Sequence, residues 1–246
     1  MAKQQSRNRL PPGQLCYLCG RPIAEGEPWN RDHVPPQRFF GHVVRTQHNP
    51  QLDWLPTHTL CNSAYQADED YLVVSFVGQA QSATGNAVMS DLKRAYSKGH
   101  SQRLIQDTIR RMGTVQTSDG LIVFEYQSAR AKRVIWKLTR GLYFREVGAV
   151  LPETADHSVL ITNPTGAARD LLIVEDVYPH VRDTESMGSY PAVFDYKWLG
   201  VRGDDGAGRM HAMAMLLWDG ILAVVMFHDP TCRCERCVER QTRARG

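Results

Sequence analysis

Two pairs of potential zinc ligands constrain the fold of this chain more than any other feature of its sequence. Cys16 and Cys19 form a Cys-x-x-Cys pair, and about forty residues later His58 and Cys61 form a His-x-x-Cys pair. Three thiolates and one imidazole make a closed tetrahedral set, which is typical of structural zinc. The segment between the pairs is too short and irregular to bury a core of its own. The sequence therefore predicts a small unit that a zinc ion holds together.

The use of cysteine elsewhere in the chain agrees with metal binding. A lone Cys-x-x-Cys is also a thiol-redox motif, and it is the second pair that favours zinc. The N-terminal stretch lacks the apolar segment of a secretory signal, so we expect a cytoplasmic, reducing compartment in which cysteines bind metal or remain thiols. A second zinc site is one interpretation of the far end of the chain, and a mobile Arg-rich tail is the other. The residues concerned are His228, Cys232, Cys234 and Cys237.

The composition is that of an ordinary globular protein, with 42% apolar and 22% charged residues in a chain of 246. The longest apolar stretch, 213–227, is interrupted by Asp219 and Gly220, which predicts two strands around a turn rather than a membrane span. The formal net charge of +3 is too small for a polycation. A surface that binds nucleic acid must therefore come from local clusters of basic residues. We expect no membrane partner, and the oligomeric state is not indicated.

Two stretches with helical periodicity, 87–112 and 128–144, carry such basic clusters. Their lysines and arginines are candidate contacts to DNA phosphates, and the alternative is that they form solvated helix faces. The candidates in the first stretch are Lys93, Arg94, Arg103, Arg110 and Arg111, and those in the second are Lys132, Arg133, Lys137 and Arg140.

The dipeptide Asp32-His33 lies between the two ligand pairs, and Asn62 directly follows the second pair. Cleavage of a phosphodiester needs a base that activates water and a cation that neutralises charge on the phosphate. Asp32 and Asn62 offer the oxygen ligands that Mg²⁺ prefers. On a strand, His33 would point to the opposite side from Asp32 and could act on the water. Glu69 shares a helix face with Asn62, so it either reaches the metal or belongs to a solvated face.

The local pattern around these motifs predicts the order strand, loop, strand, helix. The prolines that follow each apolar run end the two strands, because proline lacks the donor that a ladder needs. The expected elements are a strand at 29–34, an irregular loop at 37–50, a strand at 52–55 and a helix at 61–71.

Together these motifs resemble those of the HNH endonucleases, or ββα-metal nucleases, in particular zinc-stapled members such as phage endonuclease VII. The common pattern is a Cys-x-x-Cys, then Asp-His followed by Pro, then a ligand pair that runs into Cys-Asn and a helix. It covers residues 14–72, about a quarter of the chain. The resemblance implies an enzyme that hydrolyses DNA with one divalent cation such as Mg²⁺. Asp32 and Asn62 would hold that cation, and His33 would be the general base.

Two departures from the family pattern matter. A His-x-x-Cys replaces the commoner second Cys-x-x-Cys, and zinc accepts either. The family also has a middle Asn that orients the catalytic His, and its usual place is occupied here by Asp53. A carboxylate could orient and polarise His33, with Asn49 or a backbone carbonyl as alternatives. This departure keeps open a catalytically inactive, zinc-finger-like module that binds nucleic acid.

We therefore expect an α+β protein in which a zinc-stapled ββα-metal (HNH) domain precedes a larger α+β domain of unknown fold and role. Residues 80–86 are the predicted linker. Further strands are predicted at 121–126, 158–162, 171–174, 192–199 and 210–227. The predicted parts are a flexible basic arm (1–14), the HNH domain (15–79), the second domain (87–230) and a Cys- and Arg-rich tail (231–246).

Overall fold

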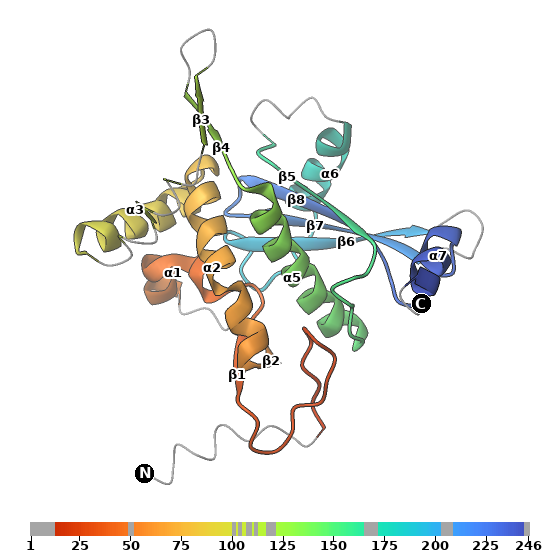
Figure 1. Ribbon diagram of the computed structural model, residues 1–246. Helices are drawn as coiled ribbons and strands as arrows, with labels where there is room; N and C mark the ends of the chain where they lie inside the picture. Colours follow the sequence, from red (N-terminus) through yellow and green to blue (C-terminus); the bar gives the residue numbers. More distant parts are fainter. Residues whose placement is uncertain are drawn as a thin grey trace.

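A four-stranded antiparallel sheet forms the centre of the computed structural model (Figure 1). Its strand order is β5-β8-β7-β6. The strands are β5 (His157–Thr162), β6 (Phe194–Arg202), β7 (Arg209–Leu217) and β8 (Ile221–His228). The residues that the structure describes are 13–48, 52–99, 102, 105–106, 110, 113–116, 122–164, 172–202 and 209–243.

Helices cover both faces of this sheet, which explains why β7 and β8 are apolar almost throughout. α5 (Ser128–Val147) packs on the face that carries Met213, Met215 and Phe227. α6 (Leu172–Asp183) packs on the opposite face against Ala214 and Val224. The predicted turn between the two strands is confirmed, since Trp218–Gly220 joins β7 to β8 in an antiparallel hairpin.

The N-terminal segment has the predicted order of strand, strand and helix. β1 (Trp29–His33) pairs antiparallel with β2 (Trp54–His58), and Asp32 lies opposite Leu55. α2 (Thr59–Phe76) follows directly and packs against α5. The predicted strand that carries Asp32 and His33 and the predicted helix that begins beside Cys61 are thus both confirmed.

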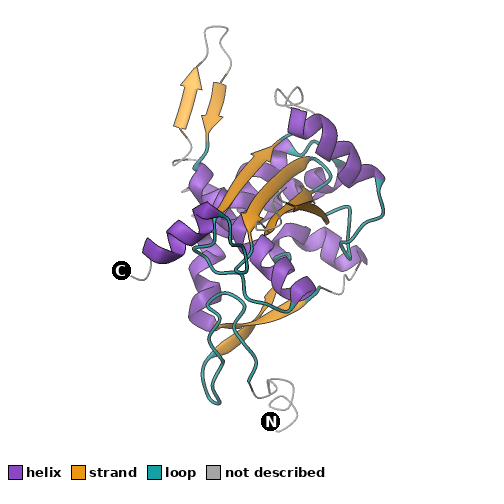
Figure 2. Ribbon diagram, turned by 90° about the vertical axis from the view of Figure 1, so that its right-hand side faces the viewer, coloured by secondary structure: helices purple, strands orange, loops and turns teal. Residues whose placement is uncertain are grey.

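The remaining elements surround these two parts. α3 (Ala83–Ser97) lies beside α1 (Gly41–His48), and the hairpin of β3 (Gly113–Gln116) and β4 (Ile122–Glu125) projects from the body in both views (Figures 1 and 2). α7 (Glu235–Arg243) ends the described chain, and 3₁₀ turns occupy Gln37–Phe40 and Val77–Gln79. The α+β class is therefore confirmed.

Several local predictions were wrong. The loop expected at 37–50 is a 3₁₀ turn followed by α1, because Phe39 and Phe40 are buried and fix the chain against the core. β2 does not end before Pro56 but continues to His58, since a two-stranded sheet leaves an open edge on which proline is tolerated. The predicted strand at 171–174 falls in α6, and residue 171 itself lies outside the described residues.

The error at α6 has a simple cause. A short apolar run fits a buried strand and a helix equally well when it is considered alone. Val174, Val177 and Val181 recur at helical spacing and pack together on the sheet, and this contact selects the helix. The linker predicted at 80–86 likewise contains the start of α3, where the Ser82 hydroxyl accepts a hydrogen bond from the Gly85 backbone N–H.

α5 connects the parts that the sequence divides into two domains. It contacts α2 on one side and strands β5 and β8 on the other, and one cluster of buried side chains extends from Cys16 to Phe227. The domain limits themselves stay a prediction. Gly141 lets α5 approach the N-terminal segment closely, because a Cβ atom there would lie 2.8 Å from a methyl carbon of Val34.

The first prediction concerns this contact. Gly141→Val should lower the free energy of unfolding by about 1–3 kcal/mol through overpacking against Val34 and Tyr17. Ala129→Val, at an exposed position of the same helix, is the control. It should lower the free energy of unfolding by only a few tenths of a kcal/mol, through its lower helix propensity. Urea denaturation of both variants measures the difference, and equal losses would contradict the close packing.

Candidate metal centres and functional cleft

The four predicted zinc ligands converge on one point. Cys16 and Cys19 lie in a tight turn that Gly20 closes with φ +74°, His58 ends β2, and Cys61 lies in the first turn of α2. The His58 Nδ1 atom lies 3.3 Å from Cys19 Sγ and 4.0 Å from Cys61 Sγ, and all four ligand atoms lie within 4.8 Å of one another. Tetrahedral zinc separates its ligand atoms by roughly 3.5–3.8 Å. The four residues can therefore hold a zinc ion.

The surroundings of this centre also suit zinc. The His58 Nε2 atom lies 3.2 Å from a carboxylate oxygen of Glu27, which is the kind of partner that orients metal-bound imidazoles. Burial disfavours ionisation of Cys19, but hydrogen bonds from Arg21, Cys16 and His58 outweigh it and lower the pKa of this thiol to about 6. Burial and the neighbouring Cys16 raise the pKa of Cys61 to about 12. A bound cation would stabilise both thiolates.

The second cluster of potential ligands also converges. The His228 Nδ1 atom lies 3.2 Å from Cys232 Sγ and 3.5 Å from Cys234 Sγ, and with Cys237 all ligand atoms lie within 4.8 Å of one another. His228 ends β8 and Cys237 lies in α7, so an ion here would fix α7 to the sheet. Arg236 and Arg240 of α7 also pair with the buried carboxylate of Asp156. The described part of the predicted tail is thus a helix that contacts the body.

Asp32 of β1 is buried, with 4% of its surface exposed, and two neighbours hold its carboxylate. The Tyr17 hydroxyl donates a hydrogen bond to Oδ2 over 2.7 Å. The Lys137 ammonium group lies 3.0 Å from Oδ1 and 2.8 Å from Oδ2. Burial and the charge of Asp32 raise the pKa of Tyr17 well above its ordinary value, so the phenol stays a donor. Because Tyr17 lies between Cys16 and Cys19, the turn that carries these two potential zinc ligands (called the zinc turn below) supports Asp32 directly.

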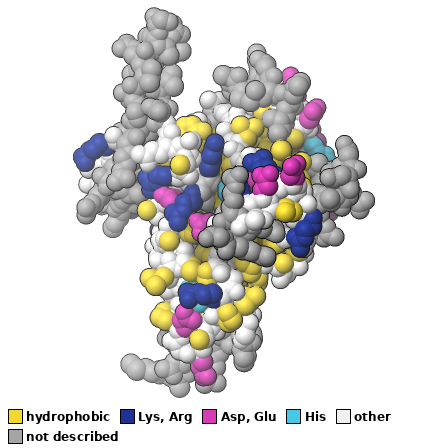
Figure 3. Space-filling view, turned by 45° about the vertical axis from the view of Figure 1, so that its right-hand side comes forward, with side chains coloured by type: hydrophobic (Ala, Val, Ile, Leu, Met, Phe, Trp, Pro, Cys, Tyr) yellow, Lys and Arg dark blue, Asp and Glu magenta, His cyan; other side chains and the backbone are white. Residues whose placement is uncertain are grey.

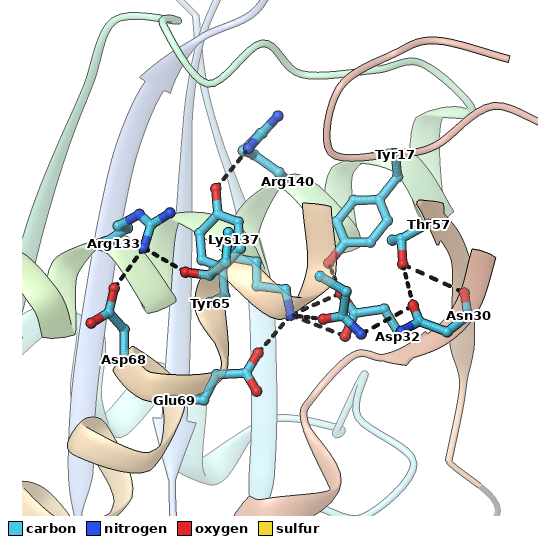
Figure 4. Close-up of polar contacts among 12 residues, drawn as sticks. Tyr17, Asn30, Asp32, Thr57, Tyr65, Asp68, Glu69, Arg133, Lys137 and Arg140 are labelled. Carbon is cyan, nitrogen blue, oxygen red and sulfur yellow. Dashed lines mark hydrogen bonds and ion pairs between the residues drawn. The ribbon is translucent and has the colours of Figure 1, made fainter. Parts of the chain in front are cut away.

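Lys137 extends from α5 toward Asp32 and Asn62, the two residues predicted from the sequence to hold a divalent cation (Figure 4). Its ammonium group lies 3.1 Å from Asn62 Oδ1 and 2.5 Å from Glu69 Oε1, in addition to the Asp32 contacts. The amide of Asn62 is itself oriented, because its Nδ2 atom donates to Asn30 Oδ1 over 3.3 Å. Asp32, Asn62 and Glu69 therefore form a converging set of oxygens around one positive charge.

These side chains line the inner wall of an open cleft of about 310 Å³. His33 lies at its edge, and Arg31, Arg38 and Arg45 form much of the remaining lining. All three arginines are exposed residues. Cation–π contact with Trp54 positions Arg31, an ion pair with Asp70 positions Arg38, and a hydrogen bond to the Gly41 carbonyl positions Arg45. The cleft thus combines a buried acidic wall with a basic rim.

His33 is the candidate base at the edge of this cleft. It is half-buried, and the side-chain amide of Gln37 lies 3.1 Å from its Nε2 atom. Burial lowers the pKa of His33 from its ordinary value, against the opposing effect of Asp32, so the neutral imidazole is favoured. An imidazole has to be in this unprotonated, neutral form before it can act as a general base.

The structure does not place the Asp53 carboxylate on His33. Asp53 Oδ2 instead accepts a hydrogen bond from Arg145 Nη1 over 2.9 Å, and 52% of the Asp53 side chain is exposed. Its backbone carbonyl accepts from the Val34 N–H, one residue beyond His33. The alternative residue, Asn49, lies outside the described residues. Among the described residues, Gln37 is the side chain that contacts an imidazole nitrogen of His33.

Most candidate phosphate contacts lie away from the cleft. Lys93 and Arg94 are exposed on α3, where Arg94 pairs with Asp91, and Arg110 is exposed. Arg103 and Arg111 lie outside the described residues. In α5, Lys137 and Arg140 are buried and Arg133 pairs with Asp68, so these three are not free helix-face contacts as predicted.

Sequence reasoning missed the residues that shape the cleft from outside the motifs. Lys137 had been assigned to a basic helix face, yet the apolar residues around it place it on the buried side of α5. For Glu69 the sequence leaves open a place near the metal or on a solvated face, and the residue is buried and lines the cleft. Arg38 and Arg45 lay in a predicted loop, and only their position on the 3₁₀ turn and α1 brings them to the rim.

The second prediction is that the purified protein carries two zinc ions per chain, one for each Cys/His cluster. Cys19→Ser should remove one zinc equivalent and destabilise the N-terminal segment, because the metal-ligand bonds there contribute to folding. Cys234→Ser should remove the other equivalent and leave the first in place. Elemental analysis of the three proteins measures this, and a zinc-free wild type would contradict it.

Comparison of the chain with known proteins adds no relative to this description. No family model, no curated protein and no solved structure matches it. No described helix has the length and apolar character required to cross a bilayer. The interpretation of the cleft therefore depends on its own geometry, namely an acidic wall beside a histidine and three arginines.

Proposed function

We propose that the protein is a metal-dependent endonuclease of the HNH type that hydrolyses DNA phosphodiester bonds in this cleft. The observation that carries the proposal is the convergence of Asp32, His33 and Asn62 on one cleft with a basic rim. The motifs that suggested the family are far apart in sequence, and the pairing of β1 with β2 is what brings them together. Hydrolysis of a phosphodiester requires this combination of oxygen ligands, base and phosphate-binding cations.

Each residue has a distinct role in the proposed reaction. Asp32 and Asn62 would hold the divalent cation, which would supply positive charge against the phosphate and the leaving oxygen. Their oxygens, with Glu69, already converge on a cationic group, which fits this role. His33 accepts the proton of the attacking water, and Gln37 restrains the imidazole at Nε2. Tyr17 keeps the Asp32 carboxylate in place.

The arginines of the rim bind the phosphates that flank the scissile bond. Basic and acidic side chains lie interspersed on the face drawn in Figure 3, so the described part of this face has no broad positive surface. At the cleft itself, the cations that could bind these phosphates are Arg31, Arg38 and Arg45. Arg38 and Arg45 also line a neighbouring cleft of about 270 Å³ between α1, α2 and α3, which extends the path for a bound strand.

A second candidate function is a module that binds nucleic acid without cutting it. The observation that favours it is Lys137, which already neutralises the oxygens that would hold the catalytic cation. In that case the zinc centres and the arginines of the rim would serve binding alone. The two functions share the basic rim and differ in the fate of the bound strand.

The third prediction tests cleavage. Plasmid DNA incubated with the protein and Mg²⁺ or Mn²⁺ should be cut, and His33→Ala should lower the rate by about 100-fold or more through loss of the base. His180→Ala, an exposed histidine on α6, is the matched control and should retain the wild-type rate. Gel electrophoresis of a time course measures the rates. Wild-type protein that binds the plasmid but leaves it intact would favour the binding module.

The fourth prediction tests binding at the rim. Arg45→Ala should weaken binding to a DNA duplex at all sequences and lower the slope of log K against log salt by about one. Arg182→Ala, which removes an exposed arginine that pairs with Asp183 on α6, is the control and should leave both values close to wild type. Fluorescence anisotropy without divalent ions at several salt concentrations provides the measurement. Equal effects of the two substitutions would argue against the cleft as the binding surface.

A further inference from the structure

The least expected feature of the cleft is the burial of a lysine behind it. Only 1% of Lys137 is exposed, although lysine is among the residues least often found fully buried. A buried ammonium group is stable only when it is paired and hydrogen-bonded. Asp32, Asn62 and Glu69 provide that compensation through contacts of 2.5–3.1 Å. The lysine and the acidic wall are therefore mutually dependent.

The position of the ammonium group excludes a direct role on the phosphate. An ammonium group has three N–H donors and no acceptor, and here Asp32, Asn62 and Glu69 surround it. Lys137 does not line the open cleft, whereas Asp32, Asn62 and Glu69 do. The lysine thus reaches the oxygens from the α5 side, and a solvated ion would reach the same oxygens from the cleft side.

The charges of the site make these two approaches exclusive. Asp32 and Glu69 contribute two negative charges, and Lys137 compensates one of them inside the wall. A divalent cation and an ammonium group held by the same three oxygens would repel each other across a short, poorly screened distance. Mg²⁺ also requires its oxygen ligands at about 2.0–2.1 Å, so an ion centred among the oxygens that Lys137 contacts would take the place of the ammonium nitrogen.

We infer that Lys137 is an internal cation that competes with the divalent ion for Asp32, Asn62 and Glu69. The inference rests on the proposed function for the role of the divalent ion, and it adds the residue that determines how readily that ion binds. In the resting protein the ammonium group satisfies the acidic wall and holds α5 against α2. A divalent ion binds only after Lys137 withdraws, so the metal requirement of the site is set from the second part of the chain. Lys137 is thus a positioning residue rather than a catalytic one.

The fifth prediction tests this competition with Mn²⁺ as the probe. Lys137→Met keeps an unbranched side chain one heavy atom shorter and removes the charge, so Mn²⁺ should bind about tenfold or more tightly than to wild type. Isothermal titration of zinc-loaded protein, with electron paramagnetic resonance to count free Mn²⁺, gives the affinities. Lys132→Met, at an exposed lysine of the same helix, is the matched control and should bind Mn²⁺ as wild type does.

Thermal stability gives a readout that does not depend on catalysis. In zinc-loaded protein without Mn²⁺, Lys137→Met should melt at a lower temperature than wild type, because Asp32 and Glu69 lose their buried partner. Mn²⁺ should restore much of this loss, and it should raise the melting temperature of wild type and of Lys132→Met far less. Should Lys137→Met fail to fold, the double variant Lys137→Met with Glu69→Gln keeps the original net charge of the wall. It should still bind Mn²⁺ more tightly than wild type.

The outcomes separate this inference from the proposed function. Tighter Mn²⁺ binding with plasmid cleavage at lower Mn²⁺ concentration would support both. Tighter Mn²⁺ binding without any cleavage by wild type or variant would support the competition and overturn the nuclease. Equal Mn²⁺ affinity of wild type, Lys137→Met and the double variant would overturn the competition, whatever the cleavage assay shows.

Discussion

The structure depends on the compensation of one buried ammonium group. Lys137 comes from α5, while Asp32, Asn62 and Glu69 come from β1 and α2, so a single set of short contacts joins residues 68 to 105 positions apart in the chain. Breaking a buried pair of this kind costs about 3–5 kcal/mol, because the remaining charge is left uncompensated. The acidic wall of the cleft and the packing of α5 on α2 are therefore parts of one interaction.

The first zinc centre extends the same framework outward. The turn between Cys16 and Cys19 places Tyr17 against Asp32. A metal ion bound at this turn would therefore also affect the position of Asp32 in the cleft, through the Tyr17 side chain. Arg140, one turn after Lys137 on α5, donates to the Leu18 carbonyl in the same turn and to the Leu151 carbonyl. The zinc turn is thus fixed from both of its sides, by its ligands and by α5. The turn that supports Asp32 is therefore held in place before any substrate binds.

The connection between the two parts of the chain limits how they can act. An N-terminal segment that ended after α2 would leave Asp32 and Glu69 without their buried cation and would expose the apolar side of α2. The sheet, through α5, therefore completes the cleft rather than merely adjoining it. The second Cys/His cluster lies at the junction of β8 and α7, where a bound metal ion would link the helix to the sheet. Both ends of the molecule thus combine short elements with a potential zinc centre.

Local chemistry was enough to predict part of this protein from its sequence. The spacing of cysteine and histidine predicted the ligand set at Cys16, Cys19, His58 and Cys61, because tetrahedral coordination needs few residues and short turns. Alternation and helical periodicity likewise predicted β1, the β7–β8 hairpin and α5. Tertiary structure alone decided that α6 is a helix, that Arg145 takes the Asp53 carboxylate, and that Lys137 enters the acidic wall. These outcomes depend on which faces of distant elements pack together. The residue pattern within one segment does not indicate which other segment it will contact.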